Sequence, residues 1–85
     1  MALDGQVWGE DGIAIKGIVS ADEGIAFGPG TEASAKNQTV IGQYNIPDAN
    51  ASFILGTGTS SYNRKNAMKV IKNTLCLPTT RSDEE

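Results

Sequence analysis

The sequence predicts an all-β fold, a solenoid of short coils in which each coil adds one strand to a growing parallel sheet. Four apolar segments of similar pattern end at positions 16, 28, 42 and 56, which gives steps of 12, 14 and 14. The stretches between them are rich in Gly, Pro, Ser, Asn and Asp, which is typical of turns. A repeat this short cannot hold a strand and a crossover helix, so successive parallel strands can stack only by coiling.

The four segments, GIAIK, GIAFG, QTVIG and SFILG, each present two apolar faces. Alternate residues of a strand point to opposite faces, and a strand that is apolar on both faces is buried on both. We predict that the larger side chains form the core of the solenoid and that the smaller ones pack between subunits. The expected core residues are Ile13, Ile15, Ile25, Phe27, Ile41, Phe53 and Leu55, and Thr39 falls on the same face. The expected interface residues are Ala14, Ala26, Val40 and Ile54.

Glycine closes three of the four segments, at Gly28, Gly42 and Gly56. A tight coil must turn sharply after each strand, and glycine reaches positive φ without a Cβ clash, so these positions are predicted corners. Lys16 breaks the pattern, which suggests an irregular first coil. We therefore expect an N-terminal cap over residues 1–11 and repeats over 12–58.

Residues 59–78 no longer follow the repeat and are expected to close the domain with a loop and a hairpin. Met68, Ile71 and Leu75 fit a helical stripe, which is one interpretation of this segment. The content of β-branched residues instead favours two strands, 67–71 and 74–77, joined by a turn at Lys72-Asn73. Pro78 would end the second strand, and residues 79–85 are expected to be a flexible acidic tail.

Length and composition limit what can stabilise this chain. A domain of 85 residues has a marginal core and usually needs extra burial, a metal or disulfides. Cys76 is the only cysteine and histidine is absent, which excludes a disulfide within the chain and the common zinc sites. The sequence therefore predicts association with further copies of the chain.

Charge is distributed unevenly along the chain, whose net charge is −3. Residues 1–48 carry seven acids against two bases, whereas residues 49–80 carry four bases and no acid. Four bases without interleaved aromatic residues do not indicate nucleic-acid binding. The basic stretch 64–72 either docks onto a partner or is an ordinary solvated surface. The N-terminus lacks the pattern of a secretory signal, and no apolar run is long enough to insert into a membrane.

We find no pattern of catalytic, cofactor-binding or metal-binding residues. Adjacent acids on a strand point to opposite faces, and the phrase GTGTSS lacks the lysine and helix of a phosphate-binding loop. Trp8 and Tyr62 would suit either stacking on a sugar or capping the ends of the solenoid. The sequence thus predicts a protein that is not an enzyme and has no cofactor.

The segment VIGQYNIPDANASFILGTGTSSYNRKNAMKV matches the form IGxYN…FxxGxGTSxxxRxNAxxV. The matching residues are Gly42, Tyr44, Asn45, Phe53, Gly56, Gly58, Thr59, Ser60, Arg64, Asn66, Ala67 and Val70. This segment resembles the block that closes the repeat region of bacteriophage fibre and receptor-binding proteins with YadA-like trimeric head repeats. Arg64 and Asn66 are expected to fix the closing loop by hydrogen bonds.

The resemblance implies a left-handed parallel β-roll, an intertwined homotrimer, and a role in virion architecture or attachment. We therefore expect a structural virion protein (a fibre, an appendage or a capsid decoration) made in the host cytoplasm and exposed on the particle surface. Its expected partners are other virion structural proteins and a host surface glycan. The alternative is a head fragment of a bacterial trimeric adhesin.

Overall fold

The computed structural model describes residues 1–77, and these residues form strands, turns and loops without a helix. The strands are β1 (Ala2–Leu3), β2 (Gln6–Val7), β3 (Ile13–Ile15), β4 (Ile18–Val19), β5 (Ile25–Phe27), β6 (Glu32–Ala33), β7 (Thr39–Gln43), β8 (Ala51–Thr57), β9 (Asn66–Ile71) and β10 (Thr74–Cys76). The helical interpretation of the C-terminal segment is therefore wrong. Over the described part of the chain there is also no helix that could span a membrane. Pro78 and the expected tail lie outside the described residues.

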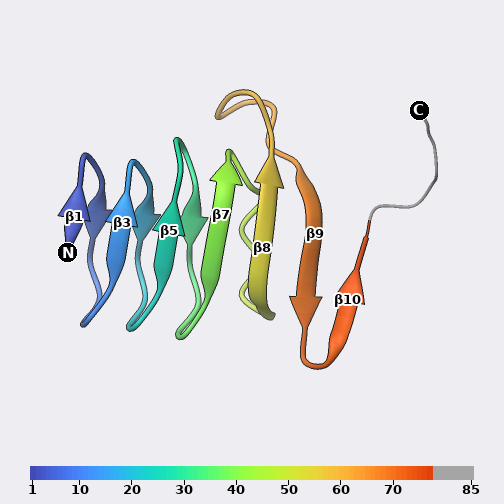
Figure 1. Cartoon of the computed structure of the whole chain (residues 1–85), viewed down its shortest axis with the longest axis horizontal. Helices are drawn as coiled ribbons and strands as arrows, with labels where there is room; N and C mark the ends of the chain where they lie inside the picture. The colour runs from blue at the N-terminus through green and yellow to red at the C-terminus, as the bar shows by residue number, and fades with distance from the viewer. Residues whose placement is uncertain (78–85) are drawn as a thin grey trace.

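The strands form two sheets that the chain visits in turn. The larger sheet has the order β1-β3-β5-β7-β8-β9-β10 and the smaller has the order β2-β4-β6 (Figure 1). All pairings from β1 to β8 are parallel. Since consecutive coils add neighbouring parallel strands to the larger sheet, and the first three coils also add strands to the smaller sheet, the predicted parallel β-solenoid is confirmed.

The register of the larger sheet reproduces the repeat of the sequence. Ile13 pairs with Ile25, Ile25 with Thr39, and Thr39 with Phe53, so each strand is offset from the next by the spacing of the apolar segments. The pairing continues toward the N-terminus, where Ala2 lies opposite Ala14. Residues 1–11, which we expected to be a cap, thus form a first coil paired like the later ones.

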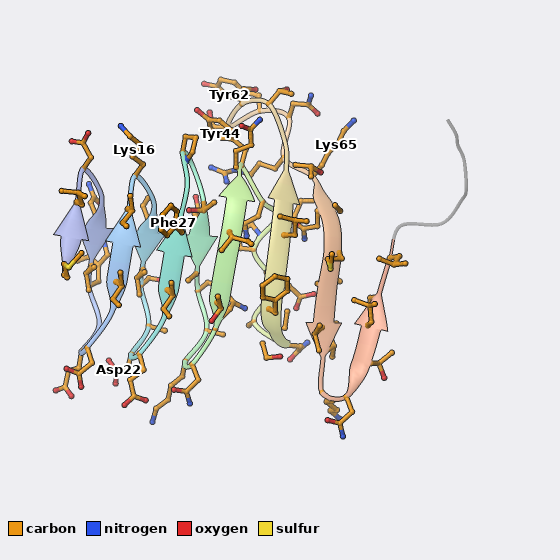
Figure 2. The ribbon with its side chains drawn as sticks, in the orientation of Figure 1. Lys16, Asp22, Phe27, Tyr44, Tyr62 and Lys65 are labelled. Atoms are coloured by element: carbon orange, nitrogen blue, oxygen red, sulfur yellow. The ribbon has the colours of Figure 1, made fainter. Side chains whose placement is uncertain are left out.

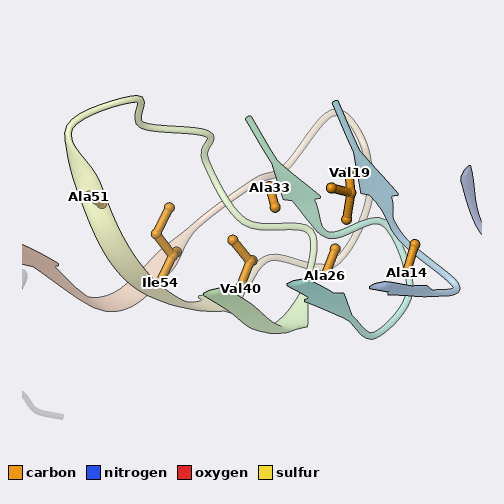
Figure 3. Packing of buried hydrophobic residues seen from close by; sticks show 7 residues of the cluster. All are labelled: Ala14, Val19, Ala26, Ala33, Val40, Ala51 and Ile54. Carbon is orange, nitrogen blue, oxygen red and sulfur yellow. The ribbon is translucent and has the colours of Figure 1, made fainter. Parts of the chain in front are cut away.

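The interior between the two sheets is filled by small side chains (Figure 3). Its buried apolar residues are Ala14, Val19, Ala26, Ala33, Val40, Ala51 and Ile54. Four of them, Ala14, Ala26, Val40 and Ile54, were expected between subunits, so that assignment is wrong. The expected core was wrong as well, because its residues alternate with these four and point away from the interior: Ile13, Ile15, Ile25, Phe27, Ile41, Phe53 and Leu55.

The inward and outward faces are the reverse of those predicted because the space inside a coil is limited. Burying the larger side chains would remove more apolar area from water, which is why they were expected inside. Protein interiors are close-packed, however, and coils this short bring the two sheets too close for two layers of large side chains. The smaller face fits, and the larger face is left on the outside of the chain.

Gly28 and Gly42 have the positive φ expected of corners, Gly28 directly after β5 and Gly42 near the end of β7, whereas Gly56 does not. Their φ angles are +126° and +104°, a region that side chains rarely adopt. A Cβ on Gly28 would collide with the carbonyl oxygen of Gly42, and a Cβ on Gly42 with that of Gly56. Gly56 lies within β8 without a positive φ, so it lines a close approach between coils and does not make a turn.

The predicted C-terminal hairpin is confirmed. Strands β9 and β10 pair antiparallel, with Thr74 opposite Ile71 and the residues Lys72-Asn73 in the turn. Strand β9 also pairs antiparallel with β8, with two irregularities in register. The hairpin therefore extends the larger sheet beyond the last coil, where the smaller sheet no longer faces it.

Candidate functional site

The outward face of the larger sheet carries two parallel columns of apolar side chains, which we call the outer stripe. One column consists of Ile13, Ile25, Thr39, Phe53, Val70 and Leu75. The other consists of Leu3, Ile15, Phe27, Ile41, Leu55 and Met68. Both columns cross from the coils onto the hairpin because the partners in each strand pair point to the same face. The sequence found most of these residues but assigned them to the wrong side of the strand.

The outer stripe is large and uncharged. Seven strands at a spacing of about 4.8 Å make it roughly 30 Å long, and two columns of side chains make it about 12 Å wide. Phe27 is 53% exposed and Ile13 is 38% exposed, so much of this apolar surface contacts water in the isolated chain. A contiguous apolar patch of several hundred Å² is unusual for a monomer and typically marks an interaction surface.

The outward face of the smaller sheet differs from the outer stripe. Gln6, Ile18 and Glu32 form one of its columns, so apolar and polar residues are mixed. One face of this sheet is buried and the other is mixed, which is typical of a sheet that has one side in contact with water. The molecule therefore has one apolar side and one side suited to water.

One side-chain amide caps the open edge of the smaller sheet at β6, and a second binds the loop that follows β7. The Oδ1 of Asn45 accepts a hydrogen bond from the backbone N–H of Glu32 at 2.7 Å, and its Nδ2 donates to the carbonyl of the same residue at 3.2 Å. Asn66 makes the same pair of bonds with the backbone of Ile46, at 2.8 and 3.0 Å. The amide of Asn45 thus supplies the donor and acceptor that another strand would supply, and the amide of Asn66 holds the backbone of Ile46 in the loop between β7 and β8.

Arg64 ties the closing loop to the preceding coil. Its Nη1 donates to the carbonyls of Gly30 and Asn45 at 2.9 and 3.1 Å, and its Nη2 lies 3.1 Å from a carboxylate oxygen of Glu32. The guanidinium also lies 5.8 Å from the ring centre of Tyr44. The expectation that Arg64 and Asn66 fix the loop by hydrogen bonds is confirmed.

Gln38 is a fully buried polar residue that the sequence analysis did not identify. Its Oε1 accepts from the N–H of Ser34 at 2.9 Å, and its Nε2 donates to the carbonyls of Asp48 and Ala51 at 2.6 and 2.7 Å. The sequence contained one signal for this role. Gln38 occupies the position directly before its strand, where the earlier repeats have Gly12 and Gly24.

Part of the basic stretch 64–72 is paired within the chain. The Nζ of Lys69 lies 2.6 Å from a carboxylate oxygen of Asp48. This hydrogen bond lowers the pKa of the Asp48 carboxyl, helped by the N–H of Asn50, and it raises the pKa of Lys69. Since Arg64 is bound to Glu32, two of the four bases already have acidic partners.

Other sequence candidates are scattered over the surface. Tyr62 is 98% exposed on the loop between β8 and β9, beyond the ends of these strands (Figure 2). Trp8 is exposed next to β2, at the other end of the solenoid. The structure does not bring these two aromatic residues together.

Residues 1–77 hold no group of three His, Cys, Asp or Glu side chains placed to bind a metal. A surface pocket of about 240 Å³ lies beside the hairpin, and Cys76 is half-buried in its wall. The other lining residues are Ile46, Asn66, Met68, Lys69 and Leu77.

Comparison with models of protein families, with curated protein sequences and with solved structures gave no match. The resemblance to phage fibre proteins therefore rests on the residues of the closing block and stays a prediction.

Proposed function

We propose that this chain is a structural protein that assembles as a homotrimer through the outer stripe and serves as a fibre, appendage or capsid decoration of a bacteriophage particle. The observation that carries the assembly is the outer stripe itself, an uncharged apolar face that crosses the whole larger sheet. The proposed number of copies, three, and the proposed location on a phage particle come from the resemblance of the closing block. In this proposal the trimer is a short rod that holds other virion proteins or contacts a host surface glycan.

Identical copies suit the outer stripe for a geometric reason. Its side chains recur at the spacing of β-strands, so the surface that matches it best has the same spacing, and another copy of the stripe has it. Packing the stripes together would also give this small chain the second half of a core, since its own interior holds mainly alanine and valine. The mixed face of the smaller sheet would remain toward water.

Ile13→Glu tests the assembly, and Ile18→Glu is its matched control. Both isoleucines are about equally exposed, at 38% and 36%, but Ile13 lies in the outer stripe and Ile18 on the smaller sheet. We expect the wild type and Ile18→Glu to be trimers by light scattering at micromolar concentration. Ile13→Glu should be monomeric or aggregated, because a trimer of this variant would bury three charges in one interface. A monomeric wild type, or equal behaviour of the two variants, would contradict the proposal.

The location is tested separately from the assembly. Antibody-gold labelling of purified phage particles should place the chain on the particle surface. Labelling confined to a bacterial cell surface would instead favour the adhesin alternative, and release of sugar from host glycans would overturn the assignment as a non-enzymatic protein.

A further inference from the structure

Thr39 is the only polar residue among the twelve of the outer stripe. It lies between Ile25 and Phe53 in its column and beside Ile41 in its strand. Its hydroxyl has no side-chain hydrogen bond to any described residue. Strand β7, which carries it, is the fourth of the seven strands, so the hydroxyl lies at the middle of the apolar face.

A hydroxyl in this place matters once the face is covered. In the isolated chain the half-buried Thr39 can bond to water. A second copy packed on the stripe would exclude that water and leave the hydroxyl without a partner, which destabilises the complex unless another polar group meets it. Every other residue of the stripe is apolar, so the only polar group that a second stripe can offer is its own Thr39.

We propose that the Thr39 hydroxyls of neighbouring copies hydrogen-bond to one another and so fix the register in which the outer stripes pack. A hydroxyl both donates and accepts, so identical residues can satisfy each other. A slip by one strand would place the hydroxyl against Ile25 or Phe53 of the neighbour. A single buried polar residue sets register in the same way in coiled coils.

This inference rests on the proposed assembly through the outer stripe. It adds a residue that selects one arrangement among several that apolar packing alone would allow. In the proposed trimer the copies are related by rotation and run parallel, so the Thr39 residues of all copies lie at the same level along the solenoid.

The test measures distances between copies in Thr39→Val, which replaces the hydroxyl by a methyl group of similar shape. A spin label at Lys36→Cys, in a Cys76→Ser background, reports the distance between copies just before β7. We expect one narrow distance for the otherwise unchanged protein and for Thr39→Ser, which keeps a hydroxyl. Thr39→Val should give a broad or multiple distribution, with association as tight as before or up to about tenfold tighter because no hydroxyl is desolvated.

A matched control is Ile25→Val, a change next to Thr39 that alters shape without polarity, and it should keep the single distance. A single unchanged distance in Thr39→Val would overturn the inference, and so would an equal loss of order in Thr39→Ser. Either result would leave the assembly through the stripe intact. A monomeric wild type would instead overturn the proposed function.

Discussion

The early and late coils of the solenoid are built on different lengths, and their interiors differ accordingly. Each coil between Ala2 and Ala26 is two positions shorter than each coil between Ala26 and Ile54. The inward position of the larger sheet holds alanine in the short coils and then Val40 and Ile54 in the long ones. A longer coil encloses more space, and larger side chains fill it.

The two extra residues enter at one corner. Only two residues separate Ile15 from Ile18, whereas four separate their partners Phe27 and Glu32. Positions that are glycine in the short coils become hydrogen-bonding residues beyond this point, as where Gln38 succeeds Gly24. Coil length thus decides whether the interior is closed by backbone contact or by buried side chains.

The largest effect is expected from removing the side chain that fills a long coil. Ile54→Ala should lower the free energy of unfolding by about 2–5 kcal/mol, because Ile54 is fully buried and the rigid coil cannot collapse around the cavity. Urea unfolding at fixed protein concentration measures it. Ile18→Ala, a partly exposed control, should cost less than half as much, and equal losses would show that the long coil can close over the cavity.

A smaller effect is expected from overfilling a short coil. Ala26→Val adds two methyl groups where the coil is narrow, and we expect it to cost about 1–3 kcal/mol. Val40→Ile adds one methyl group to the next strand, inside a longer coil, and should cost less than half of that. The melting temperatures of the two variants, each measured against the wild type, test this difference. Should Ala26→Val be the milder change, coil length would not control the interior volume.

The smallest effect concerns corner strain in the two kinds of coil. Glu23 and Asn37 are exposed and occupy equivalent corners with φ of +59° and +61°. Glu23→Gly should stabilise the protein by about 0.5–1 kcal/mol by relieving the left-handed conformation. Asn37→Gly should gain less, since asparagine tolerates that conformation. Chemical denaturation measures the free energy of unfolding of both variants. A larger gain for Asn37→Gly than for Glu23→Gly would contradict the prediction.

Much of the fold could be predicted from the sequence because it depends on local pattern. The spacing of the apolar segments indicated the register of the larger sheet, and the β-branched residues around Lys72-Asn73 indicated the hairpin. The closing block indicated the hydrogen-bonding roles of Arg64 and Asn66. Gln38 was missed because a buried amide is recognised by its three partners, one of which lies as far along the chain as Ala51.

By itself, the sequence determined that each of the four apolar segments has two apolar faces, and how these segments are spaced. Only the tertiary structure decided which face is inside. A strand places its two faces symmetrically about the backbone, so periodicity cannot rank them. The choice was made by the volume between the two sheets, which admits Ala14 and Ala26 but excludes a layer of isoleucine and phenylalanine. The large side chains are therefore on the outside, where another copy can cover them.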